Sequence, residues 1–349
     1  MTNSHTAIHE FAEFDAHHLV STIYSGDNSF VAFIAIHRGG RVPSFGATRI
    51  WRYETSQDAL RDALHLSRIM SYKAALAGLP YGGAKGVIFP LTDKVPREKI
   101  LQEYARRVNI YNGFFITGAD VGVDQNDVRI MQKESASIVG SKVDPVYFTG
   151  VGLWYGVLEC LRDVFGTDSI SDRTFSIQGL GKTGMALLSY IYEDAKAIYV
   201  SDISESKIAE ARAQYPRIQV IGPRQIYTRP VDVFVPCALS NAITRTNVKF
   251  LQCKIIVGSA NGQLEHESVG DELFQKGILY APDYVVNAGG LISVAHEYRF
   301  GNGNKIEIAK EVSEISKTMH MILEMSRKEK KAPFRIADAI GVERLAKIS

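Results

Sequence analysis

The segment FSIQGLGKTGMALLSYI, residues 175–191, decides the fold class of this chain. Gly179, Gly181 and Gly184 have GxGxxG spacing, and they stand between a β-rich run and an apolar helical run. In this context the first glycine makes a tight turn, the second lets the backbone approach a pyrophosphate, and the third lets the helix pack on the strand. The start of the helix offers unpaired N–H groups to the phosphates. The segment therefore predicts a dinucleotide-binding turn in an α/β domain.

An acidic residue indicates which dinucleotide binds. Asp202 ends the next apolar run, 197–202, and lies 23 residues after the first glycine of the turn. A carboxylate there can accept the ribose hydroxyls of NAD and would repel the 2′-phosphate of NADP. Ile203 comes next, where an NADP enzyme often has an arginine. We therefore predict NAD as cofactor, with Lys182 and Thr183 of the turn also in contact with it. A glycine turn in another kind of α/β protein is the alternative.

The second half of the chain alternates short apolar strands with helices. The runs that predict strands are 174–178, 197–202, 218–222, 231–236, 254–258 and 278–281, with a helix over 185–193 after the glycine turn. Such alternation over about 130 residues predicts a parallel, doubly wound sheet of Rossmann type.

The first half has a different pattern. We predict a strand over 29–37, a helix over 56–72 that Thr55 caps, a glycine-rich turn, a strand over 86–89, and helices near 97–110 and 124–138. The pattern changes near residue 145. The expected fold is therefore α/β with two domains, 1–145 and 146–319, and a C-terminal helix of about 320–349.

Composition excludes several classes of protein. With 46% hydrophobic and 22% charged residues, the 349-residue chain is globular. Its formal net charge of +2 argues against a nucleic-acid or membrane partner, and no apolar run reaches about 18 residues. Cys160, Cys237 and Cys253 lack metal-ligand spacing. We therefore expect free thiols in a reducing cytoplasm and no metal site.

Two lysines and one aspartate are candidates for catalysis. Lys73 and Lys85 stand on either side of the glycine-rich turn in SYKAALAGLPYGGAKGVIFP, residues 71–90. A partly desolvated ammonium has a lowered pKa, which suits activating water, and a second cation suits holding a carboxylate. Asp120 follows an apolar run in FFITGADVGVDQND, residues 114–127, as a buried acid or base would. Ordinary ion pairs for the lysines and a helix cap for Asp120 are the alternatives.

Several motifs carry a resemblance to a known family. They are GATRIW (46–51), the 71–90 segment, ITGADVG (116–122), TGVGLWYGV (149–157), QGLGKTG (178–184), VPCALSNAIT (235–244), GSANGQL (258–264) and APDYVVNAGGLI (281–292). In order and spacing the chain resembles the glutamate/leucine/phenylalanine/valine dehydrogenase superfamily, closest to the leucine/phenylalanine branch. The resemblance covers the chain from about residue 30 to its end.

The resemblance implies an activity and assigns a role to each of the three candidates. The activity is the reversible, NAD-dependent oxidative deamination of a non-polar L-amino acid to the 2-oxo acid, ammonia and NADH. Lys73 would bind the substrate α-carboxylate, Lys85 would activate water, and Asp120 would move protons to and from the amino nitrogen. Domain 1–145 would bind substrate and form a homo-oligomer, with the C-terminal helix packed on it, while domain 146–319 would bind NAD.

The resemblance also assigns residues around the cofactor. Thr149 would lie near the nicotinamide carboxamide, and Asn287 would contact the substrate amino acid. Ala238 and Asn261 lie in motifs that line the nicotinamide and its ribose in the family.

The substrate side chain is predicted to be apolar. Phe45 occupies the place where glutamate enzymes have a lysine for the side-chain carboxylate, and burying an unpaired carboxylate is costly. Gly46, Met70 and Gly118 are also assigned to the substrate. Phe45 and Ala47 would reduce the pocket while Gly118 would enlarge it, so the choice between branched-chain and aromatic amino acids stays open.

Two other functions compete with this prediction. A non-catalytic dinucleotide-binding regulator could share the fold, although it would have no need of Lys73, Lys85 and Asp120. A 2-hydroxy acid dehydrogenase usually needs a histidine base, and no histidine lies in the glycine-flanked motifs.

Overall fold

The computed structural model describes residues 7–238 and 240–348, which form two compact units. The first unit consists of the chain up to residue 143 together with 294–303 and the end of the chain from 341. The second consists of 144–293 and 304–340. The main division lies two residues before the boundary expected from the sequence.

The C-terminal part of the chain differs from the prediction. In place of one helix over about 320–349 there are two, α11 (Lys305–Glu329) and α12 (Pro333–Leu345), and only the residues from 341 belong to the first unit. The break has a local cause, because Lys330 is left-handed with φ +53° and Pro333 starts the next helix. Residues 294–303, expected in the Rossmann domain, belong to the first unit because Glu297 accepts hydrogen bonds from the backbone nitrogens of residues 140 and 142.

The first unit contains a mixed six-stranded sheet. Its strands are β1 (Leu19–Tyr24), β2 (Phe30–Ile36), β5 (Gly82–Pro90), β3 (Ser44–Phe45) and β6 (Phe115–Ile116) in spatial order, with β4 (Thr48–Ile50) also paired to β5. β2 runs antiparallel to both β1 and β5, while β3 and β4 run parallel to β5. All seven residues of β2 are buried, as expected for a continuous apolar run that is covered on both faces.

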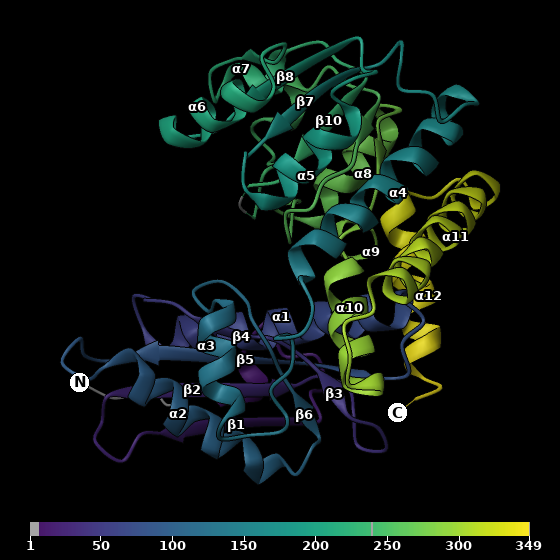
Figure 1. Cartoon of the computed structure of the whole chain (residues 1–349). Helices are drawn as coiled ribbons and strands as arrows, with labels where there is room; N and C mark the ends of the chain where they lie inside the picture. Colours follow the sequence, from purple (N-terminus) through teal and green to yellow (C-terminus); the bar gives the residue numbers. More distant parts are fainter. Residues whose placement is uncertain (1–6, 239, 349) are drawn as a thin grey trace, which may run out of the picture. The chain divides into compact units, whose positions relative to one another are not determined.

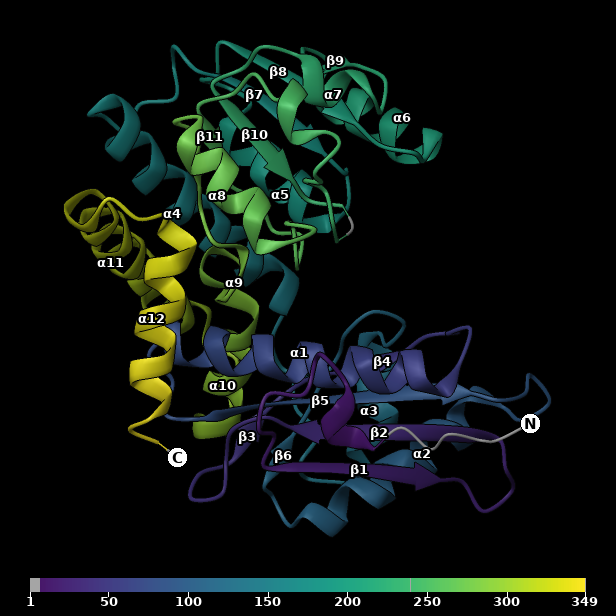
Figure 2. The same cartoon turned by 180° about the vertical axis from the view of Figure 1, so that it is seen from behind.

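Helices cover both faces of this sheet. α1 (Ser56–Leu76) packs on one face, where its Ala63 and Leu64 meet Val87 of β5. α2 (Arg97–Val108) and α3 (Gln125–Gln132) pack on the other face around Tyr104, as Figures 1 and 2 show. The predicted cap of α1 is confirmed, since Asp58 N donates to the Thr55 hydroxyl at 3.1 Å.

The segment predicted as a glycine-rich turn is part of β5. This strand begins at Gly82, not at residue 86, and it already contains Gly83. Glycine is needed for close packing at both positions. A Cβ on Gly82 would overlap the carbonyl oxygen of Arg38, and a Cβ on Gly83 would overlap the backbone of Ser71 on α1. Lys85 therefore lies in the middle of a buried strand.

The second unit contains the predicted parallel sheet. Its strands are β7 (Thr174–Gln178), β8 (Ala197–Ser201), β9 (Gln219–Val220), β10 (Val233–Pro236), β11 (Ile255–Ile256) and β12 (Leu279–Tyr280). All of them pair in parallel in the order β12-β11-β10-β7-β8-β9. Two halves that diverge from the first strand are the arrangement of the dinucleotide-binding Rossmann fold, so that prediction is confirmed.

Most of the remaining helices belong wholly or largely to this second unit. They are α4 (Pro145–Phe165), α5 (Lys182–Ile191), α6 (Glu205–Gln214), α7 (Gln225–Thr228), α8 (Glu267–Gln275) and α9 (Asp283–Val286), besides α11 and α12. Helix α10 (Gly289–Phe300) begins in the second unit, but its residues from 294 belong to the first. Short 3-10 helices occur at Ile8–Glu10, Asn109–Tyr111 and Val248–Phe250. Figure 1 shows α5 beside the carboxyl end of β7, where the glycine turn leads into it.

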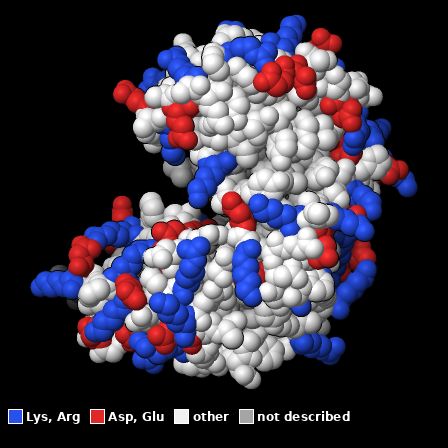
Figure 3. Space-filling view, in the orientation of Figure 1, with Lys and Arg blue, Asp and Glu red and all other residues white. Residues whose placement is uncertain are grey.

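The distribution of surface charge and the hydrophobicity of the helices are relevant to nucleic-acid and membrane partners. On the face shown in Figure 3, basic and acidic side chains are mixed over both units, in keeping with the net charge of +2. Within residues 7–238 and 240–348, no helix is both long and apolar enough to span a membrane.

Candidate active site

Lys85 and Asp120 form an ion pair in the interior of the first unit. Lys85 lies on β5, Asp120 follows β6, and the Lys85 Nζ is 2.6 Å from Asp120 Oδ2. The exposed fractions of the two side chains are 4% and 16%. A hydrogen bond between two charged groups is of the stronger kind. The structure therefore brings together the two residues that the sequence assigns to catalysis.

Burial and neighbouring charges have opposite effects on Asp120. Burial would raise the pKa of its carboxyl, but the positive charges of Lys85 and Arg49 favour the ionised form and lower the pKa to about 2. Burial lowers the pKa of Lys85, the charge of Asp120 opposes this shift, and the charge of Arg49 adds to it. At neutral pH the carboxylate is ionised, and the lysine loses its proton more readily than an exposed lysine does.

Strand β4 fixes the loop that carries Asp120. Its backbone nitrogens at residues 48 and 50 donate to the carbonyl oxygens of residues 118 and 121, at 2.9 and 3.1 Å. Gly122 has φ +78°, a conformation that favours glycine. A Cβ on Gly118 would lie 2.6 Å from the carbonyl oxygen of Val139. Backbone packing therefore explains the glycine at 118, and a contact of Gly118 with substrate stays a prediction.

Arg49 is a third charged residue at this pair, which the sequence analysis missed. Its Nε lies 3.0 Å from Asp120 Oδ2, and its Nη1 lies 2.7 Å from Asp62 Oδ2. Asp62 also accepts a hydrogen bond from the Tyr53 hydroxyl. The signal was present in GATRIW, where Arg49 is the one charged residue of a motif that carries the family resemblance.

Lys73 and Met70 lie on α1 beside the strand that carries Lys85. Lys73 is 8% exposed, which is unusual for a lysine on a helix surface. The backbone of α1 at residues 70 and 71 packs directly against Gly83 of β5. Lys73 is thus a buried residue of the helix that packs on β5, while its contact with a substrate carboxylate stays a prediction.

Phe45 is enclosed by two tyrosines that the sequence analysis did not identify. Its side chain is fully buried, and its ring centroid lies 4.5 Å from that of Tyr81 and 5.2 Å from that of Tyr298. Tyr298 lies on α10, in the segment that the sequence assigned to the other domain. Gly46 follows Phe45, and a Cβ there would overlap the carbonyl oxygen of Ala84. The place where a glutamate enzyme would have a lysine is therefore surrounded by aromatic rings.

The glycine turn of the second unit has the geometry that a pyrophosphate requires. Gly179 has φ +99°, and a Cβ on Gly184 would overlap the Gly179 carbonyl oxygen. A Cβ on Gly181, the first residue before α5, would meet nothing within 4 Å. Asp202 accepts the backbone N–H of Leu180 at 2.7 Å, which holds the carboxylate beside the turn. The residues present therefore fit a bound dinucleotide.

A buried amide network extends this site. The Asn287 side chain donates to Asn261 Oδ1 at 2.9 Å and to the Ser259 carbonyl oxygen at 3.2 Å. The Ser259 hydroxyl donates to Thr183 in the glycine turn at 2.8 Å. Asn287 Oδ1 is buried and has no hydrogen-bond partner in the described part of the chain. Because buried acceptors are nearly always paired, this oxygen favours a ligand that donates a hydrogen bond.

Comparison with known protein families divides the chain near the main boundary between the two units. Residues 19–137 match the model described as "Glu/Leu/Phe/Val dehydrogenase, dimerisation domain", and residues 140–349 match "Glutamate/Leucine/Phenylalanine/Valine dehydrogenase". The chain belongs to this dehydrogenase family.

Individual relatives of this dehydrogenase align over most of their length. Leucine dehydrogenase of Bacillus subtilis is 34% identical over 323 residues, which cover 91% of this chain and 88% of that protein. L-Tryptophan dehydrogenase of Nostoc punctiforme is 40% identical over 270 residues, 76% of each chain. A crystal structure of L-tryptophan dehydrogenase from Nostoc punctiforme has a TM-score of 0.81 at 35% identity and covers 95% of this chain and 96% of that chain.

Two further predicted cofactor residues of the dehydrogenase lie at close backbone contacts. The Thr149 hydroxyl donates to the Pro145 carbonyl oxygen within α4 at 2.8 Å, and a Cβ on Gly290 would lie 2.7 Å from that hydroxyl. A Cβ on Gly179 would lie 2.9 Å from the Ala238 nitrogen. Ala238 thus touches the glycine turn, whereas contact of Thr149 and Ala238 with a nicotinamide stays a prediction.

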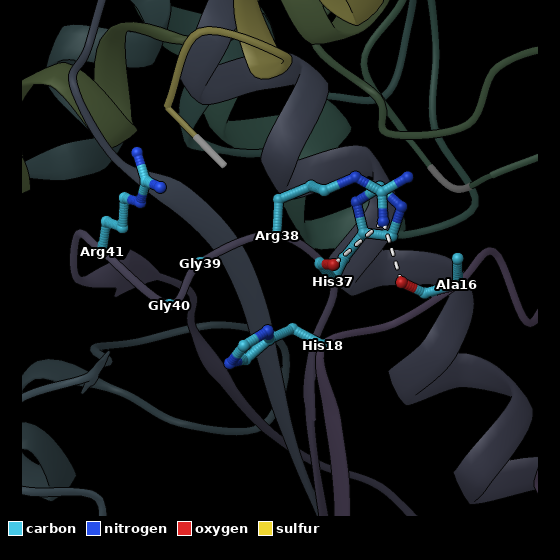
Figure 4. Close-up of a pocket in the computed structure, with 7 residues that line it drawn as sticks. All are labelled: Ala16, His18, His37, Arg38, Gly39, Gly40 and Arg41. Carbon is cyan, nitrogen blue, oxygen red and sulfur yellow. Dashed lines mark hydrogen bonds between the residues drawn. The ribbon is translucent and has the colours of Figure 1, made fainter.

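A cavity of about 310 Å³ in the first unit is lined by none of the predicted site residues. It is lined by Ala16, His18, His37, Arg38, Gly39, Gly40 and Arg41. Figure 4 shows the Arg38 side chain directed to the Ala16 carbonyl oxygen, to which it donates at 3.0 Å, while Arg41 points elsewhere. The Arg38 guanidinium therefore binds the backbone at residue 16, which also lines the cavity. Among the described residues, no group of three or more His, Cys, Asp and Glu could hold a metal ion.

Proposed function

We propose that this dehydrogenase catalyses the reversible, NAD-dependent oxidative deamination of a non-polar L-amino acid. The balanced reaction converts the amino acid, NAD⁺ and water into the 2-oxo acid, ammonium, NADH and a proton. The observation that carries the proposal is the buried ion pair of Lys85 and Asp120, because this chemistry needs a proton carrier beside a cation.

The bound cofactor supplies the hydride acceptor, and residues of the first unit supply the rest of the chemistry. Asp120 is ionised at neutral pH, so it can take a proton from the substrate ammonium and later return one to the departing nitrogen. Lys85 carries an ammonium whose proton is loosely held, so it can orient the attacking water and stabilise the oxygen that becomes the carbonyl. One carboxylate and one cation then share the proton transfers.

Substrate recognition follows from the other buried groups. Lys73 supplies a cation for the α-carboxylate, which every amino acid shares. Phe45 lies among aromatic rings, so a second carboxylate on the substrate would be buried without a partner. We therefore propose an apolar substrate. The relatives named leucine dehydrogenase and L-tryptophan dehydrogenase leave both branched-chain and aromatic side chains open.

The cofactor is NAD in this proposal. Asp202 is held at the end of β8 by backbone N–H groups of residues 180 and 204, at 2.7 and 2.8 Å. Its negative charge would repel a 2′-phosphate. Ile203, 90% exposed, follows it and offers no counter-charge.

The protein is proposed to act as a homo-oligomer in the cytoplasm. The match of residues 19–137 to a dimerisation domain supports an oligomer. Three free, buried cysteines agree with a reducing compartment.

A scan of common L-amino acids for NADH formation tests the proposal. Turnover of leucine, valine, phenylalanine or tryptophan with NAD, and little with glutamate, is the expected result. No NADH with any amino acid would favour the non-catalytic regulator, and turnover of 2-hydroxy acids alone would favour the other dehydrogenase class. The buried Lys85–Asp120 pair argues against both of these alternative functions.

A further inference from the structure

Two cations hold the same oxygen of Asp120. Lys85 Nζ lies 2.6 Å from Oδ2, and Arg49 Nε lies 3.0 Å from the same atom. In the described part of the chain, every hydrogen bond to the Asp120 side chain ends on Oδ2. The carboxylate is thus fixed on one side, and Oδ1 is left to meet another group.

We propose that Arg49 is a positioning residue that, with Lys85, fixes Asp120 through Oδ2 so that Oδ1 exchanges protons with the substrate nitrogen. The inference rests on the proposed function and deepens it. Arg49 acts through Asp120, since its guanidinium bonds are made to the two carboxylates.

The guanidinium is itself held in place from behind. Its Nη1 lies 2.7 Å from Asp62 on α1, and the Tyr53 hydroxyl donates to the same Asp62 oxygen. Arg49 and Asp62 are 19% and 22% exposed, so solvent screens this chain of contacts only in part. A planar guanidinium can bind two carboxylates at fixed angles with different nitrogens, which a single ammonium cannot do.

The strand register explains why Arg49 reaches this position. β4 pairs in parallel with β5, and Arg49 lies opposite Val87. Side chains alternate along a strand, so Lys85 and Val87 point to one face of the sheet, and the paired Arg49 points to that face too. This is the face that α1 covers, because Val87 packs with Ala63 and Leu64. One face therefore receives Arg49 and Lys85 from neighbouring strands and Asp62 from the helix.

The charges around the pair give Arg49 a measurable effect. The charged groups that act on Lys85 are Asp120, Arg49 and Asp62, and those that act on Asp120 are Lys85 and Arg49. Arg49 lowers the pKa of both residues. Loss of its charge should therefore raise both pKa values and move the pH profile of kcat/KM upward, which a merely structural residue would not do.

The substitution Arg49→Gln tests this role. We expect kcat/KM for the preferred amino acid to fall roughly tenfold to a hundredfold, the effect of one lost hydrogen bond to a charged group. The acidic limb of the profile should move up by roughly one unit or more. Arg49→Lys should keep the limb near its wild-type position but lower kcat, because one ammonium cannot hold both carboxylates. Arg52→Gln is the matched control, since Arg52 pairs with exposed Asp93 and should leave activity unchanged.

A second measurement does not depend on turnover. The pH dependence of Lys85 acetylation by acetic anhydride, followed by peptide mass spectrometry with exposed Lys317 as reference, reports the proton affinity of Lys85 directly. In Arg49→Gln its midpoint should shift to higher pH. An unchanged midpoint, or a pH profile that superimposes on the wild type, would overturn the role of Arg49. If the wild-type protein turns over no amino acid, the proposed function fails while this labelling still decides the role of Arg49.

A second variant covers the case in which Arg49→Gln does not fold. Asp62→Asn removes the anchor of the guanidinium but keeps the charge of Arg49. We expect a lower kcat without the upward shift of the pH profile, because the charge of Asp62 raises the pKa of Lys85 and its loss acts in the opposite direction to the loss of Arg49. Wild-type kcat in a folded Asp62→Asn protein would contradict the proposal, because the anchor would then have no effect on Asp120.

Discussion

Replacing Asp120 by asparagine should damage both catalysis and stability. The change keeps the size of the side chain but removes the charge that pairs with Lys85 and Arg49. Two buried or half-buried cations then face each other without a carboxylate between them. Because a general acid–base group contributes roughly a hundredfold to ten-thousandfold, we expect kcat to fall by that amount.

The size of the stability loss follows from the pKa of Asp120. Folding lowers this pKa from its ordinary 3.8 to about 2, and one unit is worth about 1.4 kcal/mol, so the ionised carboxylate contributes about 2 kcal/mol. That contribution is fully present above the unfolded pKa and is lost as the pH falls through the folded one. Breaking a buried pair from one side typically costs about 3–5 kcal/mol, because the partner stays behind unpaired. We therefore expect a loss of about 2–5 kcal/mol at neutral pH.

The loss should shrink as the pH rises. Folding lowers the pKa of Lys85 below its ordinary value, and Asp120 opposes that shift. Without Asp120, Lys85 loses its proton at a still lower pH. A lysine whose pKa is lower in the folded state than in the unfolded state reduces the free energy of unfolding. The reduction is complete below the folded-state pKa, and it disappears as the pH approaches the unfolded-state pKa of about 10.4. The variant should gain stability relative to the wild type between neutral pH and that limit.

Urea denaturation near neutral pH and at about pH 9.5, together with steady-state kinetics, measures both effects. Asp93→Asn is the matched control, because Asp93 is 74% exposed and its pair with Arg52 should be worth little. A stability loss of the same size at both pH values would refute the assignment of the penalty to an unpaired Lys85. A kcat within tenfold of the wild type would refute Asp120 as the proton carrier.

Three further predictions concern recognition. Lys73→Met should raise KM for the amino acid roughly tenfold or more, with NADH affinity unchanged in fluorescence titration, since the contact with the substrate carboxylate is lost. Phe45→Lys should lower turnover of leucine and phenylalanine. Equal kcat/KM in the wild type and in this variant would count against the assignment of Phe45 to the substrate pocket. Asp202→Ser should lower the ratio of NAD to NADP activity, because it weakens NAD binding and relieves the repulsion of the 2′-phosphate of NADP. An unchanged ratio would show that Asp202 does not determine the choice of cofactor.

The second unit could be predicted well from the sequence because its strands are short apolar runs. Each run from 174–178 to 278–281 contains a strand of the parallel sheet, in Rossmann order. A strand buried on both faces needs apolar residues throughout, so its position shows in one sequence. The glycine turn also predicted the helix that follows it, although that helix begins at Lys182 and not at residue 185.

The first unit was predicted less completely because its packing depends on distant partners. β1 was missed, since LVSTIY mixes polar and apolar residues at an edge of the sheet. Gly82 and Gly83 were interpreted as a turn because glycine is rare in strands. Their reason lies in Arg38 and Ser71, whose backbones approach them. Such approaches are set by the whole fold and leave no local signal.

The catalytic pair was predicted by residue type, but its full charge set was not. Lys85 and Asp120 stood out because each lies among apolar residues. Arg49 is the one charged residue of GATRIW, yet a single arginine between Thr48 and Ile50 is equally consistent with a surface residue. What identifies it is the pairing of β4 with β5, which no spacing in the sequence reveals.

The alternation along β5 connects the fold to the chemistry. Ala84 and Ile88 belong to the core on the α2 side, and Gly86 faces Tyr104 there. Gly83, Lys85 and Val87 therefore point to the α1 side, where Gly83 lets the helix backbone come close. A larger residue at 83 would push α1 away from the strand, and with it both Lys73 and the Asp62 that anchors Arg49. The close packing of α1 on β5 therefore requires a glycine at position 83. The same close packing buries Lys85, because it excludes the water that would otherwise screen the charge of the lysine.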